Sequence, residues 1–266
     1  MDTQDVKNVA TQASDHPALE TAARVGYATS GLLHLLIGWI ALQVAFAGSG
    51  KSADQSGALA SLSGNTVGRF GLWIAVLGFL GLAVWQGVDA VVGHPGDRKD
   101  AWSGRAKAVA KCVVYLALSW TAFRFAQGHA TSSRTQTVDF TRTLLGEPGG
   151  RALVVALGLV VIVVGLYHVR KGWTKKFLQD LEDHPGTWAT RAGRVGYIAK
   201  GVALAIVGIL FIGAGLHQQA KEASGLDGAL RTLRGEPFGT ALLVAMAAGF
   251  AAYGLYSFSR ARHAKV

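Results

Sequence analysis

The chain of 266 residues has little charge, few prolines and one cysteine. Only 16% of its residues are charged and half are hydrophobic, a balance that argues against an ordinary soluble domain. The single Cys112 excludes an internal disulfide, and no cluster of Cys and His has the spacing of a zinc site. The five prolines all lie outside the middle of the long apolar runs, so long helices are not interrupted.

Charge is missing altogether from five blocks of 18 to 23 residues, which are Val25–Ala47, Phe70–Val88, Ala152–Val169, Gly201–Ala220 and Phe238–Ser259. A helix needs about 20 mostly apolar residues to cross a membrane, so each block predicts a span. The uncharged run between Lys111 and Arg124 is shorter, and its length fits a buried soluble helix equally well. No stretch alternates in polarity as the strands of a barrel do. We therefore expect an all-α integral membrane protein.

An internal repeat indicates that the run between Lys111 and Arg124 is a sixth span. The phrases ARVGYATSG (23–31) and GRVGYIAKG (193–201) have a weaker third copy, GRAKAVAKC (104–112). Downstream segments align as well: LSGNTVGR (62–69), LLGEPGGR (144–151) and LRGEPFGT (233–240). A His-Pro pair precedes each unit. The short run occupies the first-helix position of the second unit, so the repeat predicts three two-helix units and six transmembrane helices.

We divide the chain accordingly. A polar tail (1–15) is followed by repeat 1 (16–93, spans about 25–47 and 68–90), repeat 2 (94–183, spans about 107–127 and 150–170), repeat 3 (184–260, spans about 194–217 and 238–258) and a basic tail (261–266). Two spans per unit return the chain to the side where it began. Parallel repeats of this kind are related by an axis along the membrane normal, which predicts a pseudo-threefold bundle.

The basic residues indicate the orientation. Seventeen of the 26 flank the N-terminus, the second and fourth loops and the C-terminus. The positive-inside rule then predicts that both termini are cytoplasmic in a multi-pass protein of the cell (inner or plasma) membrane. The net charge of +10 is expected to attract anionic lipid at that face. No segment outside the spans is long enough to form a nucleic-acid-binding domain.

Several motifs have plain structural explanations. Gly-Glu-Pro (146–148 and 235–237) is typical of a helix start. SGLDGALRTL (224–233) has the spacing of a short helix lying on the outer surface. Trp173, Phe177 and Leu181 share a face and suggest a helix in the inner membrane interface. Small residues at helical spacing, such as Gly201, Ala205 and Gly208, predict packing seams between helices; a pore lining is the alternative.

Lys111 and Lys200 are the sharpest functional candidates. Each lies six residues beyond the arginine of its unit, Arg105 or Arg194, which is about 9 Å deeper along a helix. Their side chains could snorkel back to the interface, or could hold an anionic headgroup together with those arginines. Ser30 takes the lysine position in the unit of Arg24. His34 and Tyr115 are further polar residues of the first helices, and they could line a polar route.

The histidines of the three His-Pro pairs, His16, His94 and His184, could also meet at the threefold axis and bind a metal, but Pro commonly begins a helix. A metal site also needs supporting second-shell contacts, which nothing in the sequence indicates. We therefore expect no metal and no cofactor.

The quoted segments ARVGYATSG, GRVGYIAKG, LDGALRTLRGEPFGT and the terminal AAYGLYSF resemble the repeated unit of a bacterial, largely actinobacterial, membrane family catalogued as domain of unknown function 1206. The likeness runs from about residue 16 to 260, and unit two departs from it where Lys107 and Cys112 replace glycines. The resemblance implies three two-helix repeats in an inner membrane. It carries no catalytic residue.

Two kinds of function remain. The favoured hypothesis is a non-enzymatic membrane protein that scaffolds, or binds lipid, a membrane-protein partner or a second copy of itself. The alternative is a channel or small-solute transporter whose path follows the first helices of the units. No nucleophile–base pair suggests an enzyme. The side chains of Ser30, His34, Lys111, Tyr115 and Lys200 discriminate the two, because a path requires them to share one cavity.

Overall fold

The computed structural model describes residues 16–48, 50–92 and 98–265, so the predicted tail 1–15 and the His94-Pro95 pair lie outside the described residues. Across these ranges the protein consists of nine α-helices and two short 3-10 helices. Six helices are long and apolar enough to cross a membrane: α2 (Pro17–Ala47), α4 (Thr66–Val92), α5 (Arg98–Ala126), α7 (Gly150–Trp173), α8 (Thr187–His217) and α10 (Gly239–His263). The sixth span, predicted from the repeat, is therefore present as α5.

Each unit has the same order of helices, a long one, a short one and a second long one. The short helices are α3 (Gln55–Ser63), α6 (Ser133–Gly146) and α9 (Gly225–Gly235), and the 3-10 helices are η1 (Lys176–Asp180) and η2 (Ala220–Glu222). The expected short helix within 224–233 is thus confirmed as α9. The His-Pro pair of the first unit starts α2, with the His16 side chain accepting a hydrogen bond from the Ala18 amide.

The repeated segment between the short and the second long helix forms a tight turn. Glu147 ends α6, and its carbonyl accepts a hydrogen bond from the Gly150 amide at the start of α7. Pro148 therefore lies in the turn, whereas the sequence predicted it at the first helical position. A methyl group at Gly68, Gly150 or Gly239 would lie 1.7–2.1 Å from a carbonyl oxygen of the preceding helix. Only glycine fits there, which explains why all three units share it.

Long helices of successive units form the closest pairs, α4 with α5, α7 with α8 and α10 with α2. Matching positions meet in each pair. A methyl group at Gly38 would lie 2.9 Å from the Ala247 carbonyl oxygen, and one at Gly208 would lie 2.6 Å from that of Gly158. Ser119 instead donates a hydrogen bond to the Val76 carbonyl, 2.9 Å away. The small-residue stripe of Gly201 and Gly208 is therefore a packing seam, as predicted.

Packing within a unit differs between the three. The long helices pack in units one and three, but α5 and α7 scarcely touch along their described lengths. A methyl group at Gly26 would lie 2.3 Å from the Gly78 carbonyl oxygen, and one at Gly196 would lie 2.5 Å from Tyr253 Cα. Lys107 occupies the same position in unit two. Because a lysine side chain cannot fit where backbones approach so closely, the second unit is not a packed hairpin.

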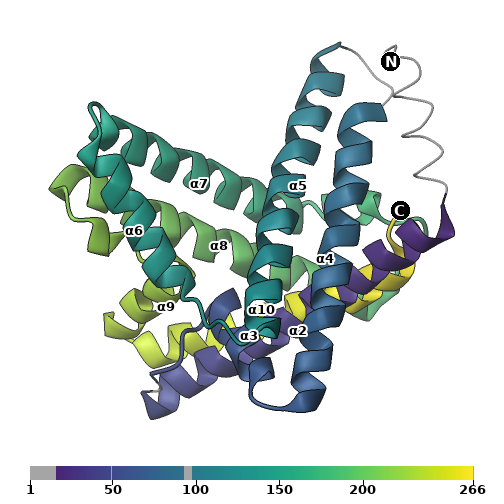
Figure 1. Cartoon of the computed structure of the whole chain (residues 1–266), viewed down its shortest axis with the longest axis horizontal. Coiled ribbons are helices and arrows are strands. Elements are labelled where there is room, and N and C mark those ends of the chain that lie inside the picture. The colour runs from purple at the N-terminus through teal and green to yellow at the C-terminus, as the bar shows by residue number, and fades with distance from the viewer. Residues whose placement is uncertain (1–15, 49, 93–97, 266) are drawn as a thin grey trace.

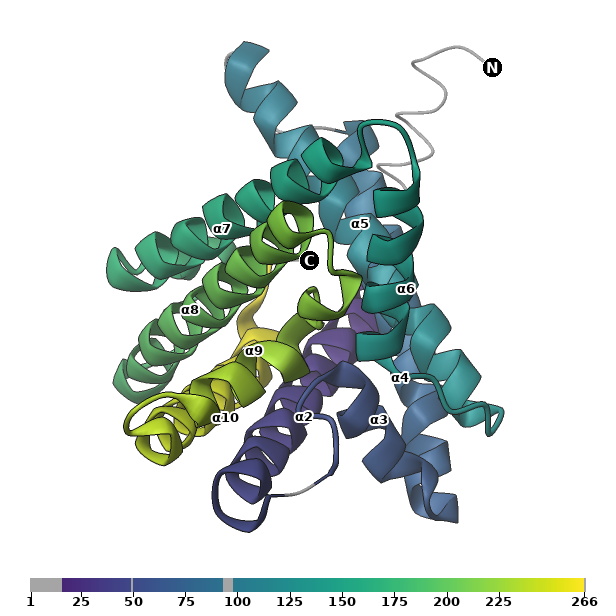
Figure 2. The same ribbon diagram turned by 90° about the vertical axis from the view of Figure 1, so that its left-hand side faces the viewer.

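As a result α5 and α7 diverge in both views, and α6 crosses between their far ends (Figures 1 and 2). The 14 residues of α6 span about 21 Å, enough to bridge the wider separation. Only 22% of the apolar stretch of α5 and 17% of that of α7 are buried, against 39–50% in the other long helices. The pairs also cross steeply, with α4 and α5 upright in Figure 1 and α7 and α8 lying across them.

Candidate functional site

One end of the bundle, here called the basic end, is where α2, α5 and α8 begin and α4, α7 and α10 end. An aromatic cluster fills part of it. Phe177 of η1 is fully buried against Tyr197 and Tyr256, with ring centroids 5.2 and 5.1 Å away. Trp173 is 66% exposed, so it does not share a membrane face with Phe177. The predicted interfacial helix at 173–181 is therefore wrong, because Phe177 anchors this loop into the bundle.

The expected basic tail is also held at this end. Helix α10 continues to His263, and the next residues pair with the loop after η1. The Glu182 amide donates to the His263 carbonyl at 2.8 Å, and the Lys265 amide donates to the Asp180 carbonyl at 3.2 Å. Residues 261–265 thus form part of the wall of the basic end.

A polar pocket of about 430 Å³ opens beside this wall. Its lining combines residues of α2, α4, α5, η1 and α10 and of the segments that follow η1 and α10: Tyr27, Trp85, Gln86, Asp89, Lys111, Gln179, Asp180, Glu182, Arg260 and Lys265. Lysine, arginine and carboxylate side chains are mixed, but Asp180 is already held by the Lys171 ammonium at 2.5 Å. The lining then retains three cations, Lys111, Arg260 and Lys265, against the carboxylates of Asp89 and Glu182. We call this the basic-end pocket.

Among the described residues, two buried atoms of the pocket lining have no hydrogen-bond partner, the donor Nε of Arg260 and the acceptor Oε1 of Gln86. The rest of Arg260 is fixed, since Nη2 donates to the Tyr27 hydroxyl at 3.2 Å and Cζ lies 4.1 Å from the Tyr27 ring centroid. Buried polar groups in folded proteins are almost always paired with protein or solvent. A donor and an acceptor that lack partners on two residues of one pocket are the basis for considering a polar ligand there.

The predicted arginines do not reach the basic-end pocket. Arg24 pairs with Glu20 and donates to the carbonyls of Ala261 and Arg262, so it caps the end of α10. Arg194 lies over the Trp173 ring, 4.8 Å from its centroid. Arg105 is exposed on α5. Of the predicted site residues, only Lys111 lines the pocket.

The remaining candidates lie deeper and make contacts of their own. His34 shares a hydrogen bond with the Ser30 carbonyl at 2.7 Å and packs on Tyr253, and Lys200 Nζ lies 4.5 Å from the centroid of the same ring. Tyr115 stacks on Phe79. None of these four lines the basic-end pocket. The five side chains proposed to share a cavity are thus not brought together in it.

Sequence reasoning missed Arg260 and Tyr27 as site residues. Arg260 reads as one of several basic residues that flank a span, and the charge pattern alone does not distinguish it. The signal that could have identified it is its place in the last turn of α10, opposite the first turns of α2. Gln86 is a polar residue within a span and is buried, 4% exposed.

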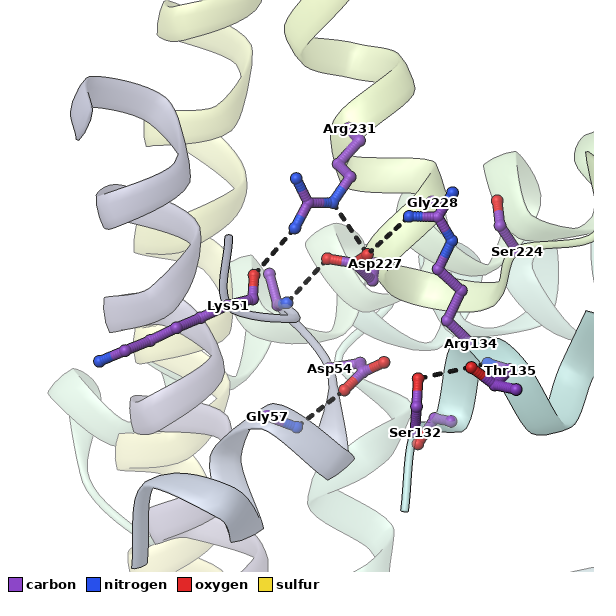
Figure 3. A network of polar contacts seen from close by, with 12 residues as sticks. Lys51, Asp54, Gly57, Ser132, Arg134, Thr135, Ser224, Asp227, Gly228 and Arg231 are labelled. Atoms are coloured by element: carbon purple, nitrogen blue, oxygen red, sulfur yellow. Dashed lines mark hydrogen bonds and ion pairs between the residues drawn. The ribbon is translucent and has the colours of Figure 1, made fainter. Parts of the chain in front are cut away.

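At the opposite end a second polar network joins the three units (Figure 3). Asp227 of α9 is 1% exposed and accepts hydrogen bonds from the Ala53 amide and Arg231 Nε, both at 2.9 Å. Arg231 also donates to the Lys51 carbonyl, and Arg134 of α6 lies 3.7 Å from Asp227. These contacts hold α9 and the start of α6 against the loop before α3.

Asp54 completes this network from the first unit. Its Oδ1 accepts hydrogen bonds from Ser56 Oγ at 2.6 Å and the Gly57 amide at 2.9 Å, which caps α3 (Figure 3). Ser56 Oγ in turn accepts from the Ser133 amide of α6. Burial raises the pKa of the Asp54 carboxyl above its ordinary value, and the two hydrogen bonds only partly oppose this. Because Asp54, Ser56 and Asp227 are paired, the network is a clamp between units.

Metal binding at the His-Pro pairs finds no support in the contacts. The His184 side chain accepts a hydrogen bond from the Gly186 amide, much as His16 does at the start of α2. His94 lies outside the described residues. Within the described part of the chain, no three His, Cys, Asp or Glu side chains gather as metal ligands.

Comparison with known proteins places the repeats in a family. A family model described as Domain of Unknown Function (DUF1206) matches residues 25–93, 106–175 and 195–264. The three matched regions coincide with the three units, which confirms the resemblance seen in the sequence. The chain is also similar to the uncharacterized protein YxxB of Bacillus subtilis (strain 168), with 27% identity over 252 residues, 92% of this chain and 90% of the relative. No solved structure matches the chain.

Proposed function

Because the chain belongs to the DUF1206 family, whose description assigns no activity, we propose a function from its own geometry. The protein is a multi-pass membrane protein without enzymatic activity that binds a phosphate-bearing headgroup in the basic-end pocket. The observation that carries this proposal is the unpartnered Arg260 Nε, on a residue that lines the same pocket of about 430 Å³ as Lys111.

The donor set favours phosphate. A guanidinium fixed by the Tyr27 ring and hydroxyl is pre-organised, so little side-chain entropy is lost when it binds an anion. Charge-assisted hydrogen bonds to phosphate oxygens are about twice as strong as neutral ones. The orphan acceptor Gln86 Oε1 would accept a hydrogen bond from a hydroxyl of the same headgroup. A phosphodiester with a hydroxylated headgroup satisfies both atoms.

The expected orientation supports this function. The positive-inside bias predicts that the basic end and both termini are cytoplasmic, and the repeat predicts a parallel arrangement of the three units about one axis. Anionic lipids give the cytoplasmic leaflet a negative surface potential, which concentrates such headgroups beside the pocket. No observation on the pocket favours a conducting path, because Ser30, His34, Tyr115 and Lys200 do not line it.

The test is to remove the Lys111 charge. We expect Lys111→Met to weaken binding of phosphatidylglycerol about 10- to 100-fold, since a charge-assisted hydrogen bond contributes about 1.5–3 kcal/mol. Binding is measured by native mass spectrometry of the purified protein with added lipid, and glycerol 3-phosphate serves as a soluble probe. The matched control is Lys176→Met, an exposed lysine at the same end of the bundle and outside the pocket. Equal binding by both variants and the unaltered protein would contradict the proposal.

A further inference from the structure

The second unit is open where the other two are closed, and its exposed positions identify the opening. Val160 and Val164 on α7 are 58% and 41% exposed. Their counterparts in unit three are Gly249, which is buried, and Tyr253, which is 6% exposed. On α5, Val114 is 56% exposed. In unit one, Leu33 at the equivalent position is 2% exposed.

By their equivalence in the repeat, Val114, Val160 and Val164 mark the sides of α5 and α7 that would be buried in a closed unit. We call the space between these two sides the lateral slot. Lys107 closes its narrow end, with Nζ 5.7 Å from the Tyr167 ring centroid. Lys111, which lines the basic-end pocket, lies one turn further along the same α5. The slot and the pocket thus adjoin on one helix. The apolar positions of the slot therefore neighbour a polar site that holds three cations, three carboxylates and an unpartnered acceptor.

We propose that the lateral slot admits one acyl chain of an anionic glycerophospholipid whose phosphate occupies the basic-end pocket. This inference rests on the proposed function and names the source of the headgroup. Charge complementarity argues for this occupant. With Asp180 paired to Lys171, the pocket lining carries more cations than carboxylates. A free phosphate ester would use the pocket but leave the slot without a role. A zwitterionic choline lipid has no donor for Gln86 Oε1.

The test places a bulky side chain in the slot and leaves the residues of the pocket unchanged. We expect Val160→Trp to reduce retention of phosphatidylglycerol at least tenfold in native mass spectrometry, while binding of glycerol 3-phosphate stays unchanged. Val164→Phe is a second variant with the same expected result. Leu159→Trp is the matched control, because Leu159 and its counterpart Leu77 are 53% and 63% exposed, on the outer side of their units. Phosphatidylcholine is the control lipid and should be retained no better by one variant than by another.

The outcomes separate the two proposals. Loss of phosphatidylglycerol in Val160→Trp, with soluble headgroup binding kept, supports the slot. If Val160→Trp behaves like Leu159→Trp while Lys111→Met loses both ligands, the headgroup site stands and the slot is overturned. If neither Lys111→Met nor Val160→Trp changes binding of either ligand, the proposed function fails, and the inference falls with it.

Discussion

At the scale of single residues, a glycine in the first long helix controls how near the second can come. Gly26 and Gly196 meet the backbone of their partner helices at distances that leave no space for a side chain. Lys107 takes this position in unit two and is exposed. The sequence already marked Lys107 as a departure from the repeat. Its consequence, an open unit, depends on where α5 and α7 lie, and no local pattern encodes that.

Asp54 is the residue for which pH dependence can be derived. Its raised pKa means that the folded state binds this proton more readily than the unfolded state. The carboxyl therefore contributes stability at low pH, and that contribution is lost as pH rises from the unfolded pKa, near 4, through the raised folded value.

We expect Asp54→Asn, which keeps a good helix cap, to be more stable relative to the unaltered protein at pH 7 than at pH 4.5. Thermal unfolding of both proteins in the same detergent, followed by circular dichroism, measures the difference. Two melting-temperature profiles that run parallel over this range would show that Asp54 does not titrate as its burial requires.

At the scale of elements, the short helices link the three units rather than only capping their own. Asp227 joins α9 to the loop of the first unit through the Ala53 amide, and Ser56 joins α3 to α6. The amphipathic spacing predicted α9 correctly from sequence. The role of Asp227 could not be predicted, because its partner Ala53 is 174 residues away in the chain.

Asp227→Ala would leave the Ala53 amide unpaired and the Arg231 charge uncompensated. Breaking a buried pair by removing one partner costs about 3–5 kcal/mol, and the partial exposure of Arg231 places the expected loss of unfolding free energy near 3 kcal/mol. Asp139→Ala is the control, since Asp139 and Arg142 form an exposed pair on α6 and such pairs contribute under about 1 kcal/mol. The free energies of unfolding are measured with denaturant. Equal losses in the two variants would contradict the role of Asp227 in holding the units together.

The long helices were predictable because charge-free runs of membrane length leave few alternatives. The α5 span needed the repeat, since its own uncharged run is short. The prediction for residues 173–181 was wrong because Trp173, Phe177 and Leu181 have the spacing of an interfacial helix. Phe177 is in fact drawn into the aromatic cluster by Tyr197 and Tyr256. A face of apolar residues predicts that the face is buried, but the sequence does not distinguish burial in lipid from burial in protein.

At the scale of the whole molecule, each unit packs against the next through one pair of long helices, so the three units form a cycle. Within the second unit, however, the two long helices stay apart. Equivalent positions meet in all three inter-unit pairs, at Gly38, Ser119 and Gly208, so the repeat extends to the packing. The open unit adjoins the basic-end pocket, and the proposed ligand uses both. Sequence symmetry predicts three equal units. The proposed function depends on how the second unit departs from them.

Cysteine cross-linking in native membranes tests this asymmetry most directly. In unit three, a methyl group at Gly249 would lie 2.2 Å from Ala199 Cβ, and Ala110 and Val160 are the equivalent positions of unit two. A disulfide needs about 3.8 Å between its Cβ atoms, so α8 and α10 must separate slightly at this pair. In a Cys112→Ser background, we predict that Ala199→Cys and Gly249→Cys form a disulfide under mild oxidation. The pair Ala110→Cys and Val160→Cys should not. Equal cross-linking of both pairs would show that the second unit is closed in the membrane and would contradict this account.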